Sequence, residues 1–153
     1  MQPAPFFADA AQGPAGGHAL WARAEDGTRL RLAHWPTDGA ARGTVFLFNG
    51  RSEYAEKYGP TAAALTRAGW HVATLDWRGQ GLSDRNGPDP MLGHVVDFAE
   101  YQQDARALLG QIDLWFSNVG SGVVLAFMNK GFSSIVGCAV PSPRRLGQWR
   151  GLR

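Results

Sequence analysis

The sequence is short of cysteine, of charge and of long hydrophobic runs, and each shortage excludes a class of protein. Its 153 residues include one cysteine, Cys138. One cysteine excludes an intrachain disulfide framework and a multi-cysteine zinc site. Charged residues make up 18% and hydrophobic residues 44% of the chain. This balance argues against wholesale disorder and suits one domain with a buried core.

No segment has the pattern of a targeting signal or a membrane span. The N-terminal residues 1–7 lack a positively charged n-region and a long apolar run, so they do not resemble a signal peptide. Residues 119–140 are mostly apolar but contain Asn129 and Lys130, whereas a membrane span needs about 20 apolar residues. With a single cysteine, this pattern predicts a cytoplasmic protein.

The net charge of +2 conceals two halves of opposite sign. Residues 1–110 carry 10 Lys and Arg against 12 Asp and Glu, whereas residues 111–153 carry 5 against 1. If the positive net charge indicates a binding partner, that partner would therefore bind the Arg-rich tail. Such a tail permits weak contact with an anionic membrane surface, although solvated disorder is commoner. We expect no nucleic-acid partner.

Three regions are predicted along the chain. Residues 1–17 form a flexible Pro/Ala/Gly-rich arm, residues 18–110 carry regular patterns, and residues 111–153 form an atypical, partly disordered tail. Within the middle region, alternation of Arg29, Leu30, Arg31 and Leu32 predicts a strand with one wet face.

The order of predicted elements indicates an α/β fold. A hairpin feeds a mostly parallel sheet with flanking helices and right-handed crossovers. The expected elements are hairpin strands 19–24 and 28–35, a buried strand 44–48, a helix 60–68, a second buried strand 70–75 and a helix 97–109.

Two loops follow the buried strands, where open α/β sheets place their sites. In residues 49–54, Gly50 frees the backbone to turn so that a following N–H can face a ligand oxygen, unless the segment is an ordinary strand-to-helix turn. Residues 76–83 contain two glycines, but the third small residue of a dinucleotide-binding fingerprint is missing and no helix is predicted to follow directly. There Asp76 and Arg78 are expected to pair locally and hold a tight turn.

Together these loops resemble the α/β-hydrolase superfamily, in its lysophospholipase, monoacylglycerol-lipase and serine-aminopeptidase-like branch. Residues 49–54 (Asn-Gly-Arg-Ser-Glu-Tyr) lie where that branch has His-Gly-x-x-Glu, so Asn49 is a departure. Residues 76–83 match its Asp-x-Arg-Gly-x-Gly-x-Ser signature in full. The likeness covers about residues 18–110.

The resemblance implies a serine hydrolase of carboxylic esters, acting on a small-molecule ester or lipid without cofactor or metal. It makes Gly50 and Arg51 the oxyanion-hole candidates, with the Arg51 N–H as donor and a second donor after the nucleophile. The remaining motif residues would be active-site loop architecture rather than reacting groups: Asn49, Glu53, Asp76, Arg78, Gly79, Gly81 and Ser83.

The reacting groups themselves are missing, so no catalytic residue is identified. The family reaction needs Gly-x-Ser-x-Gly, followed by an acid and a histidine. Ser121 has Val119 and Val123 at the flanking positions, and Ser133 has Ile135 where a small residue belongs. No histidine follows His94. We therefore expect an incomplete α/β-hydrolase fold, truncated and catalytically incomplete.

Two explanations of residues 111–153 remain open. The tail is either a foreign continuation, from a frameshift or a disrupted gene, or a native shortened sheet with strands near 119–127 and 135–140. Two functions remain open as well. The chain is either the N-terminal part of an ester hydrolase or a non-catalytic binding or scaffolding remnant of the fold.

Overall fold

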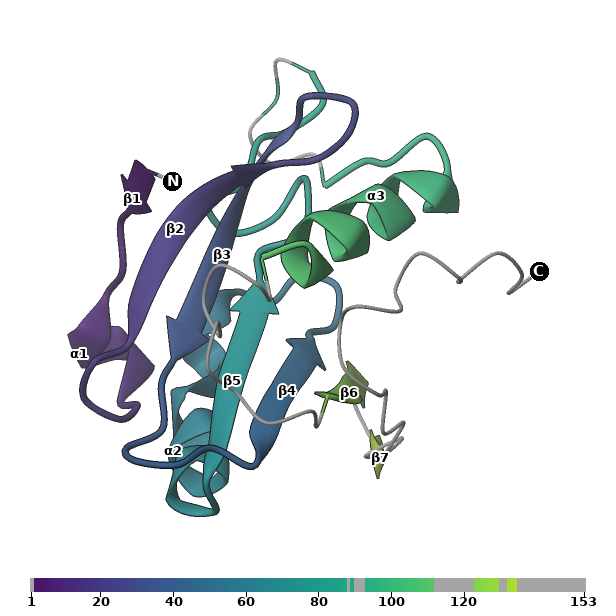
Figure 1. The fold of residues 1–153 in the computed structure, drawn as a ribbon. Helices are drawn as coiled ribbons and strands as arrows, with labels where there is room; N and C mark the ends of the chain where they lie inside the picture. The colour runs from purple at the N-terminus through teal and green to yellow at the C-terminus, as the bar shows by residue number, and fades with distance from the viewer. Residues whose placement is uncertain (1, 88, 90–92, 112–122, 130–131, 135–153) are drawn as a thin grey trace.

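A computed structural model describes residues 2–87, 89, 93–111, 123–129 and 132–134, and these build a seven-stranded mixed sheet of order β1-β2-β3-β5-β4-β6-β7 (Figure 1). The strands are β1 (Gln2–Ala4), β2 (His18–Arg23), β3 (Arg29–Trp35), β4 (Gly43–Phe48), β5 (Trp70–Leu75), β6 (Val123–Asn129) and β7 (Phe132–Ser134). The helices are α1 (Ala8–Ala11), the 3₁₀ turn η1 (Ala55–Tyr58), α2 (Gly59–Arg67) and α3 (Phe98–Leu109).

The predicted hairpin and the predicted parallel pair are both confirmed. β2 and β3 pair antiparallel, and Gly27 closes their turn at a φ of 87°, a value that glycine adopts without strain. β3 then pairs antiparallel with β5, and β5 pairs parallel with β4. The carboxyl ends of β4 and β5 therefore lie at the same edge of the sheet.

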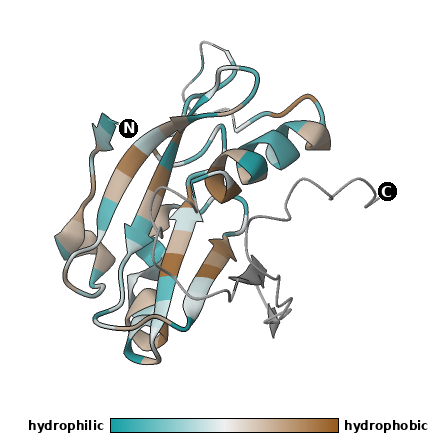
Figure 2. Ribbon diagram, in the orientation of Figure 1, coloured by the Kyte–Doolittle hydropathy of each residue, from teal (hydrophilic) through white to brown (hydrophobic). Residues whose placement is uncertain are grey.

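Helices α2 and α3 cover opposite faces of the sheet. The helix predicted over residues 60–68 is α2, with Pro60 in its first turn, and the Asp97 side chain caps α3 by accepting from the Ala99 N–H at 2.8 Å. Leu108 of α3 joins one core cluster, and Ala62 of α2 joins the other. β4 is buried at every position between them. Its apolar residues belong to the hydrophobic bands at the centre of the sheet in Figure 2.

The N-terminal residues differ from the flexible arm that their composition predicted. β1 pairs antiparallel with β2, and α1 follows it along the same edge (Figure 1). Ala11 is 1% exposed, and its carbonyl oxygen would lie 1.7 Å from a Cβ placed on Gly59. The segment is held by this contact with the α2 end, which lies far along the chain. The proline and glycine content of the segment does not predict this contact.

The structure describes part of the region after residue 110. β6 pairs parallel with β4, and β7 pairs antiparallel with β6. β6 overlaps the strand predicted near 119–127, whereas residues 135–140 and the Arg-rich tail lie outside the described residues. Within the described ranges, no helix combines the length and the hydrophobicity that crossing a bilayer requires.

Candidate functional site

The two loops that the sequence singled out come together at the carboxyl edge of β4 and β5. We call residues 49–54 the β4 loop and residues 76–85 the β5 loop. The Ser52 N–H donates to the Gln80 Oε1 at 2.6 Å, and the Trp77 indole N–H donates to the Asn49 carbonyl at 2.8 Å. These bonds join segments 28 residues apart in sequence. The candidate site is thus one structure built from both motifs.

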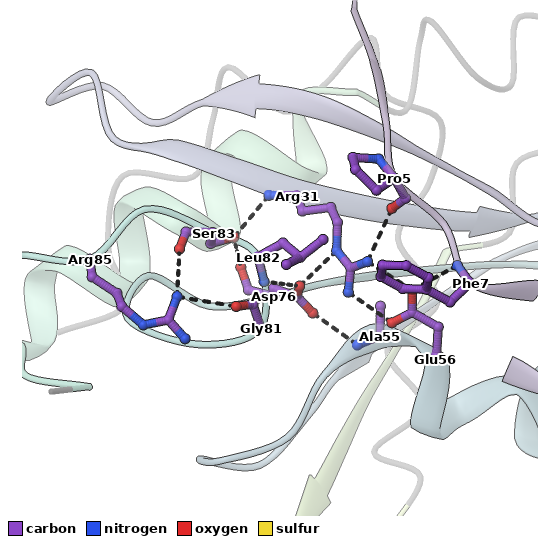
Figure 3. A network of polar contacts seen from close by, with 10 residues as sticks. All are labelled: Pro5, Phe7, Arg31, Ala55, Glu56, Asp76, Gly81, Leu82, Ser83 and Arg85. Atoms are coloured by element: carbon purple, nitrogen blue, oxygen red, sulfur yellow. Dashed lines mark hydrogen bonds and ion pairs between the residues drawn. The ribbon is translucent and has the colours of Figure 1, made fainter. Parts of the chain in front are cut away.

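Asp76 is the central acceptor of this structure (Figure 3). Its carboxylate is fully buried and accepts from the Arg31 Nε at 2.7 Å. It also accepts from the Ala55 N–H and the Leu82 N–H, each at 2.8 Å. A buried carboxylate must be paired and hydrogen-bonded to offset its lost hydration. Asp76 therefore connects β3, the β5 loop and the start of η1, directly after the β4 loop.

Arg31 corrects the prediction of a wet face on β3. Its side chain is 2% exposed, and its two terminal nitrogens donate to the Glu56 carboxylate at 2.7 and 2.8 Å. The N-terminal segment covers it, since the Pro5 carbonyl accepts from Arg31 at 3.1 Å and the Phe7 N–H donates to Glu56 at 3.2 Å (Figure 3). The alternation in β3 correctly placed Arg31 on the face opposite to Leu30 and Leu32, but it could not predict that the N-terminal segment covers that face.

Arg78 makes a second buried ionic centre. Its Nε and Nη2 donate to the Asp104 Oδ1 of α3 at 2.9 and 2.7 Å, and its Nη1 lies 2.6 Å from the Asp26 carboxylate in the hairpin turn. Burial raises the pKa of Asp104 more than the Arg78 guanidinium lowers it. The local Asp76–Arg78 pair predicted from sequence is wrong: these two side chains pair with Arg31 and Asp104 respectively.

Ser83 and the two motif glycines complete the β5 loop. The Ser83 hydroxyl donates to the Asp76 carbonyl at 2.6 Å and accepts from the Arg31 N–H at 2.8 Å. Gly79 and Gly81 have φ angles of 76° and 48°. A Cβ on Gly81 would lie 2.0 Å from the Asp76 Oδ2. Glycine is therefore required at position 81 both by backbone conformation and by space.

Glu53 organises the β4 loop. It accepts from the Gly50 N–H at 2.9 Å and from the Lys57 ammonium and the Tyr58 hydroxyl. Burial acts to raise the pKa of Glu53, but these hydrogen bonds outweigh it and hold the pKa below its ordinary value. Burial, followed by the Glu53 carboxylate, raises the pKa of Tyr58. Glu53 is therefore the anionic member of a compact hydrogen-bonded group.

Among the described residues, the Arg51 and Tyr54 amides of the β4 loop have no acceptor. The Gly50 N–H is taken by Glu53, and the Ser52 and Glu53 N–H groups both donate to the Gln80 Oε1. Among the described residues, nothing accepts from the Arg51 N–H. Ser52 follows it at a φ of 67°, a left-handed conformation that costs a non-glycine residue about 1 kcal/mol or more. The loop thus turns sharply beside the unbonded Arg51 donor.

Asn49 lies at the end of β4 with an unpaired side chain. It is 5% exposed, and no group in the described part of the chain bonds its Oδ1 or Nδ2. A buried amide without partners costs about 1–3 kcal/mol. Such an exception to normal hydrogen bonding is found mainly at functional or strained positions.

A pocket of about 340 Å³ opens between the two loops. It is lined by Arg51, Ser52, Glu53, Tyr54, Gly79, Gln80, Gly81, Arg85 and Gly93. Sequence reasoning named four of these residues as candidates and missed Gln80 and Arg85, although both lie in or directly beside the β5-loop motif. Over the described ranges, no cluster of three or more His, Cys, Asp or Glu side chains has a geometry that could hold a metal ion.

The chain matches a family model described as serine aminopeptidase, S33, over residues 39–129. It is 33% identical over 111 residues to a monoacylglycerol lipase from Mycolicibacterium smegmatis, across 66% of this chain and 38% of that protein. It is 42% identical over 67 residues to lysophospholipase L2 of Escherichia coli K12, across 44% of this chain and 20% of that protein. The chain therefore spans well under half the length of either relative.

The fold has solved counterparts. A soluble variant of monoglyceride lipase from Saccharomyces cerevisiae superposes with a TM-score of 0.63 at 21% identity, covering 86% of this chain and 40% of the lipase. At this identity the likeness concerns the fold rather than the reaction.

Proposed function

Because the chain belongs to the serine aminopeptidase S33 family, with lysophospholipase-like and monoglyceride-lipase-like relatives, we propose that it is the N-terminal, oxyanion-binding part of a carboxylic-ester hydrolase. Its substrate class is a small ester or lipid such as a lysophospholipid or a monoglyceride. We further propose that the 153-residue chain is catalytically incomplete by itself.

The available Arg51 N–H is the observation that carries this proposal. Ester hydrolysis by a serine places negative charge on the former carbonyl oxygen, and preorganised N–H donors stabilise that charge. Removing one such donor typically costs about 3 kcal/mol of transition-state stabilisation. In the β4 loop the flanking amides are occupied by Glu53 and Gln80, which hold the backbone while leaving the Arg51 donor unused. Gly50 then provides the backbone turn, and its N–H, which is bonded to Glu53, is not the oxyanion donor.

The other motif residues have the contacts of a scaffold. Asp76, Arg78 and Ser83 are each at most 2% exposed, and each is bonded to protein groups on more than one element. A group enclosed in this way cannot reach a substrate carbonyl. We assign these three residues to holding the β5 loop against the β4 loop.

The sequence provides no nucleophile in the family's pattern. It contains no Gly-x-Ser-x-Gly, and no histidine follows His94. Ser133, which meets half of that pattern, lies on β7 in an antiparallel hairpin with β6 instead of at a strand-to-helix elbow. Attack on an ester by a serine needs an adjacent base to take its proton. These observations support the proposal that the chain polarises a carbonyl but lacks the family's groups for attacking it.

Two measurements on the purified chain test this proposal together. Turnover of a short-chain p-nitrophenyl ester is expected to be absent, and a fluorophosphonate probe is expected to leave the chain unlabelled. Serine-dependent turnover with a labelled chain would contradict the proposed incompleteness. Translating the other reading frames of the gene beyond codon 110 tests its origin: a Gly-x-Ser-x-Gly motif there supports a truncated hydrolase, and its absence counts against one.

The pocket favours a second function, in which the chain binds a ligand without transforming it. It lies beside the Arg51 donor, and its lining contains neither a histidine nor a cysteine. Thermal stabilisation by an ester or lipid headgroup without turnover would favour this binding role.

A further inference from the structure

We propose that the pocket between the β4 loop and the β5 loop binds the phosphate of a glycerol phosphodiester, with Arg51 and Arg85 as its ligands. Both arginines line the pocket, one from each loop. The inference rests on the proposed function for its choice of an ester substrate. The binding it describes does not require turnover.

The two guanidinium groups have no carboxylate partner in the described part of the chain. Arg51 donates through Nη2 to the Gly93 carbonyl at 2.9 Å. Arg85 donates through Nη1 to the Gly81 and Ser83 carbonyls at 3.1 and 3.2 Å. A guanidinium has five N–H donors, so each arginine is anchored through one nitrogen and keeps donors for a ligand.

These anchors distinguish the pocket from an ordinary basic surface. Long exposed arginines normally lose side-chain entropy when they bind a ligand. Here the carbonyl contacts already restrict both side chains, so less entropy remains to be lost. Planar guanidinium donors match the oxygens of a phosphate group and can bind it through paired hydrogen bonds.

The net charge of the lining favours an anion. Glu53 is the one carboxylate among the lining residues, and it is compensated by the Lys57 ammonium and bonded by the Tyr58 hydroxyl. Asp76 and Asp84, which lie in the same loop, are paired with Arg31 and Arg29. Among the described residues, no carboxylate forms an ion pair with either pocket arginine.

The size and position fit a headgroup beside a scissile ester. A volume of about 340 Å³ is at the small end of ligand pockets. It suits a phosphodiester and part of a glycerol better than an acyl chain. The lining includes Arg51, whose N–H is the proposed oxyanion donor. An ester carbonyl at that donor would bring a phosphate on the same glycerol toward the two arginines.

Calorimetric titration of the 153-residue chain with sn-glycero-3-phosphocholine tests this assignment. We expect saturable binding that weakens at least about fivefold in Arg51→Gln and in Arg85→Gln, as loss of one charge-assisted contact at a partly exposed site predicts. Arg23→Gln is the matched control, because Arg23 is exposed and donates to one carbonyl, that of Gly27, at 2.8 Å away from the pocket. That variant should bind as the parent does. Circular dichroism and the melting temperature verify folding, and Arg51→Lys retains the charge if Arg51→Gln does not fold.

Three further ligands show which part of the diester the pocket recognises. Inorganic phosphate is expected to compete with the diester, whereas glycerol and choline chloride at matched ionic strength are not. Binding of inorganic phosphate with rejection of the diester would overturn the headgroup assignment. Absence of saturable binding, or equal weakening in Arg23→Gln, would overturn the site itself. None of these outcomes bears on the ester-hydrolase proposal, which translation of the other reading frames tests, or on catalytic incompleteness, which turnover and labelling test.

Discussion

Arg31 and Asp76 form an ion pair of 2.7 Å in the interior of the protein, with neither side chain more than 2% exposed. The pair joins β3 to the β5 loop, and the carboxylate extends the connection to η1, directly after the β4 loop, through the Ala55 N–H. Burial lowers the pKa of an arginine, but the Glu56 and Asp76 carboxylates outweigh it and raise the pKa of Arg31. The guanidinium is therefore charged, and the geometry of both loops depends on it.

Replacing Arg31 by methionine should strongly destabilise the protein. The change leaves the Asp76 and Glu56 carboxylates buried without their cation, and breaking a buried pair in this way costs about 3–5 kcal/mol. Arg29→Met is the matched control on the same strand, because Arg29 pairs with Asp84 at 3.2 Å with both side chains more than 40% exposed. That change should cost less than about 1 kcal/mol. Urea denaturation measures both, and equal losses would contradict a special role of Arg31.

Gly81→Ala should destabilise the protein more than Gly87→Ala. Both glycines have positive φ, 48° and 105°, so both substitutions strain the backbone. Only at position 81 would the new Cβ meet another group, the Asp76 carboxylate, whereas nothing lies within 4 Å at position 87. A φ of 105° lies further from the left-handed region open to L-residues than 48° does, so backbone strain is no smaller at position 87 and an excess loss at position 81 reports that clash. We expect the excess loss of unfolding free energy to be more than about 1 kcal/mol, and a difference near zero would show that Asp76 moves without cost.

His34 should make the protein less stable in acid. Burial, followed by the neighbouring His18 and His71, lowers the pKa of His34 from 6.5 to about 3. Between these values the unfolded chain binds a proton that the folded chain does not, so stability is lost as pH falls below 6.5. The slope reaches about 1.4 kcal/mol per pH unit.

Urea denaturation at pH 7, 6 and 5 measures this slope. His34→Leu should reduce it, whereas His94→Gln should leave it unchanged, because His94 is exposed. If all three proteins share one slope, titration of His34 is not its source.

Asn49→Leu should stabilise the protein by about 1 kcal/mol. The substitution replaces a buried amide without hydrogen bonds by an apolar group of similar volume, which removes a desolvation cost. Asn86→Leu is the control at an exposed position, where the side chain bonds Glu100 at 3.4 Å, and it should not stabilise the protein. Thermal and urea denaturation measure the two changes. Destabilisation by Asn49→Leu would mean that the amide has a partner, such as a bound water.

Elements that depend on local patterns were predictable. The hairpin turn at Gly27, the Asp97 cap of α3 and the continuous apolar strand β4 follow from short-range conformational preferences and burial. The β4 and β5 loops were identified as the candidate site because both follow buried strands, and the structure brings them into contact. Their detailed partners were not predictable, because spacing in sequence favours a local Asp76–Arg78 pair, whereas the actual partners Arg31 and Asp104 lie on other elements.

The amino-acid sequence by itself determined the succession of strands and helices, the two loop motifs and the absence of the family's nucleophile pattern. Those properties depend on residues that are close together in sequence, because their spacing sets periodicity and turn geometry. Only the tertiary structure decided that Arg31 is buried, that the N-terminal residues cover it, and that Arg51 and Arg85 share a pocket. Arg31 and Asp76 lie 45 residues apart. Contacts at such separations depend on how whole strands and helices pack together, and local sequence patterns do not predict that packing.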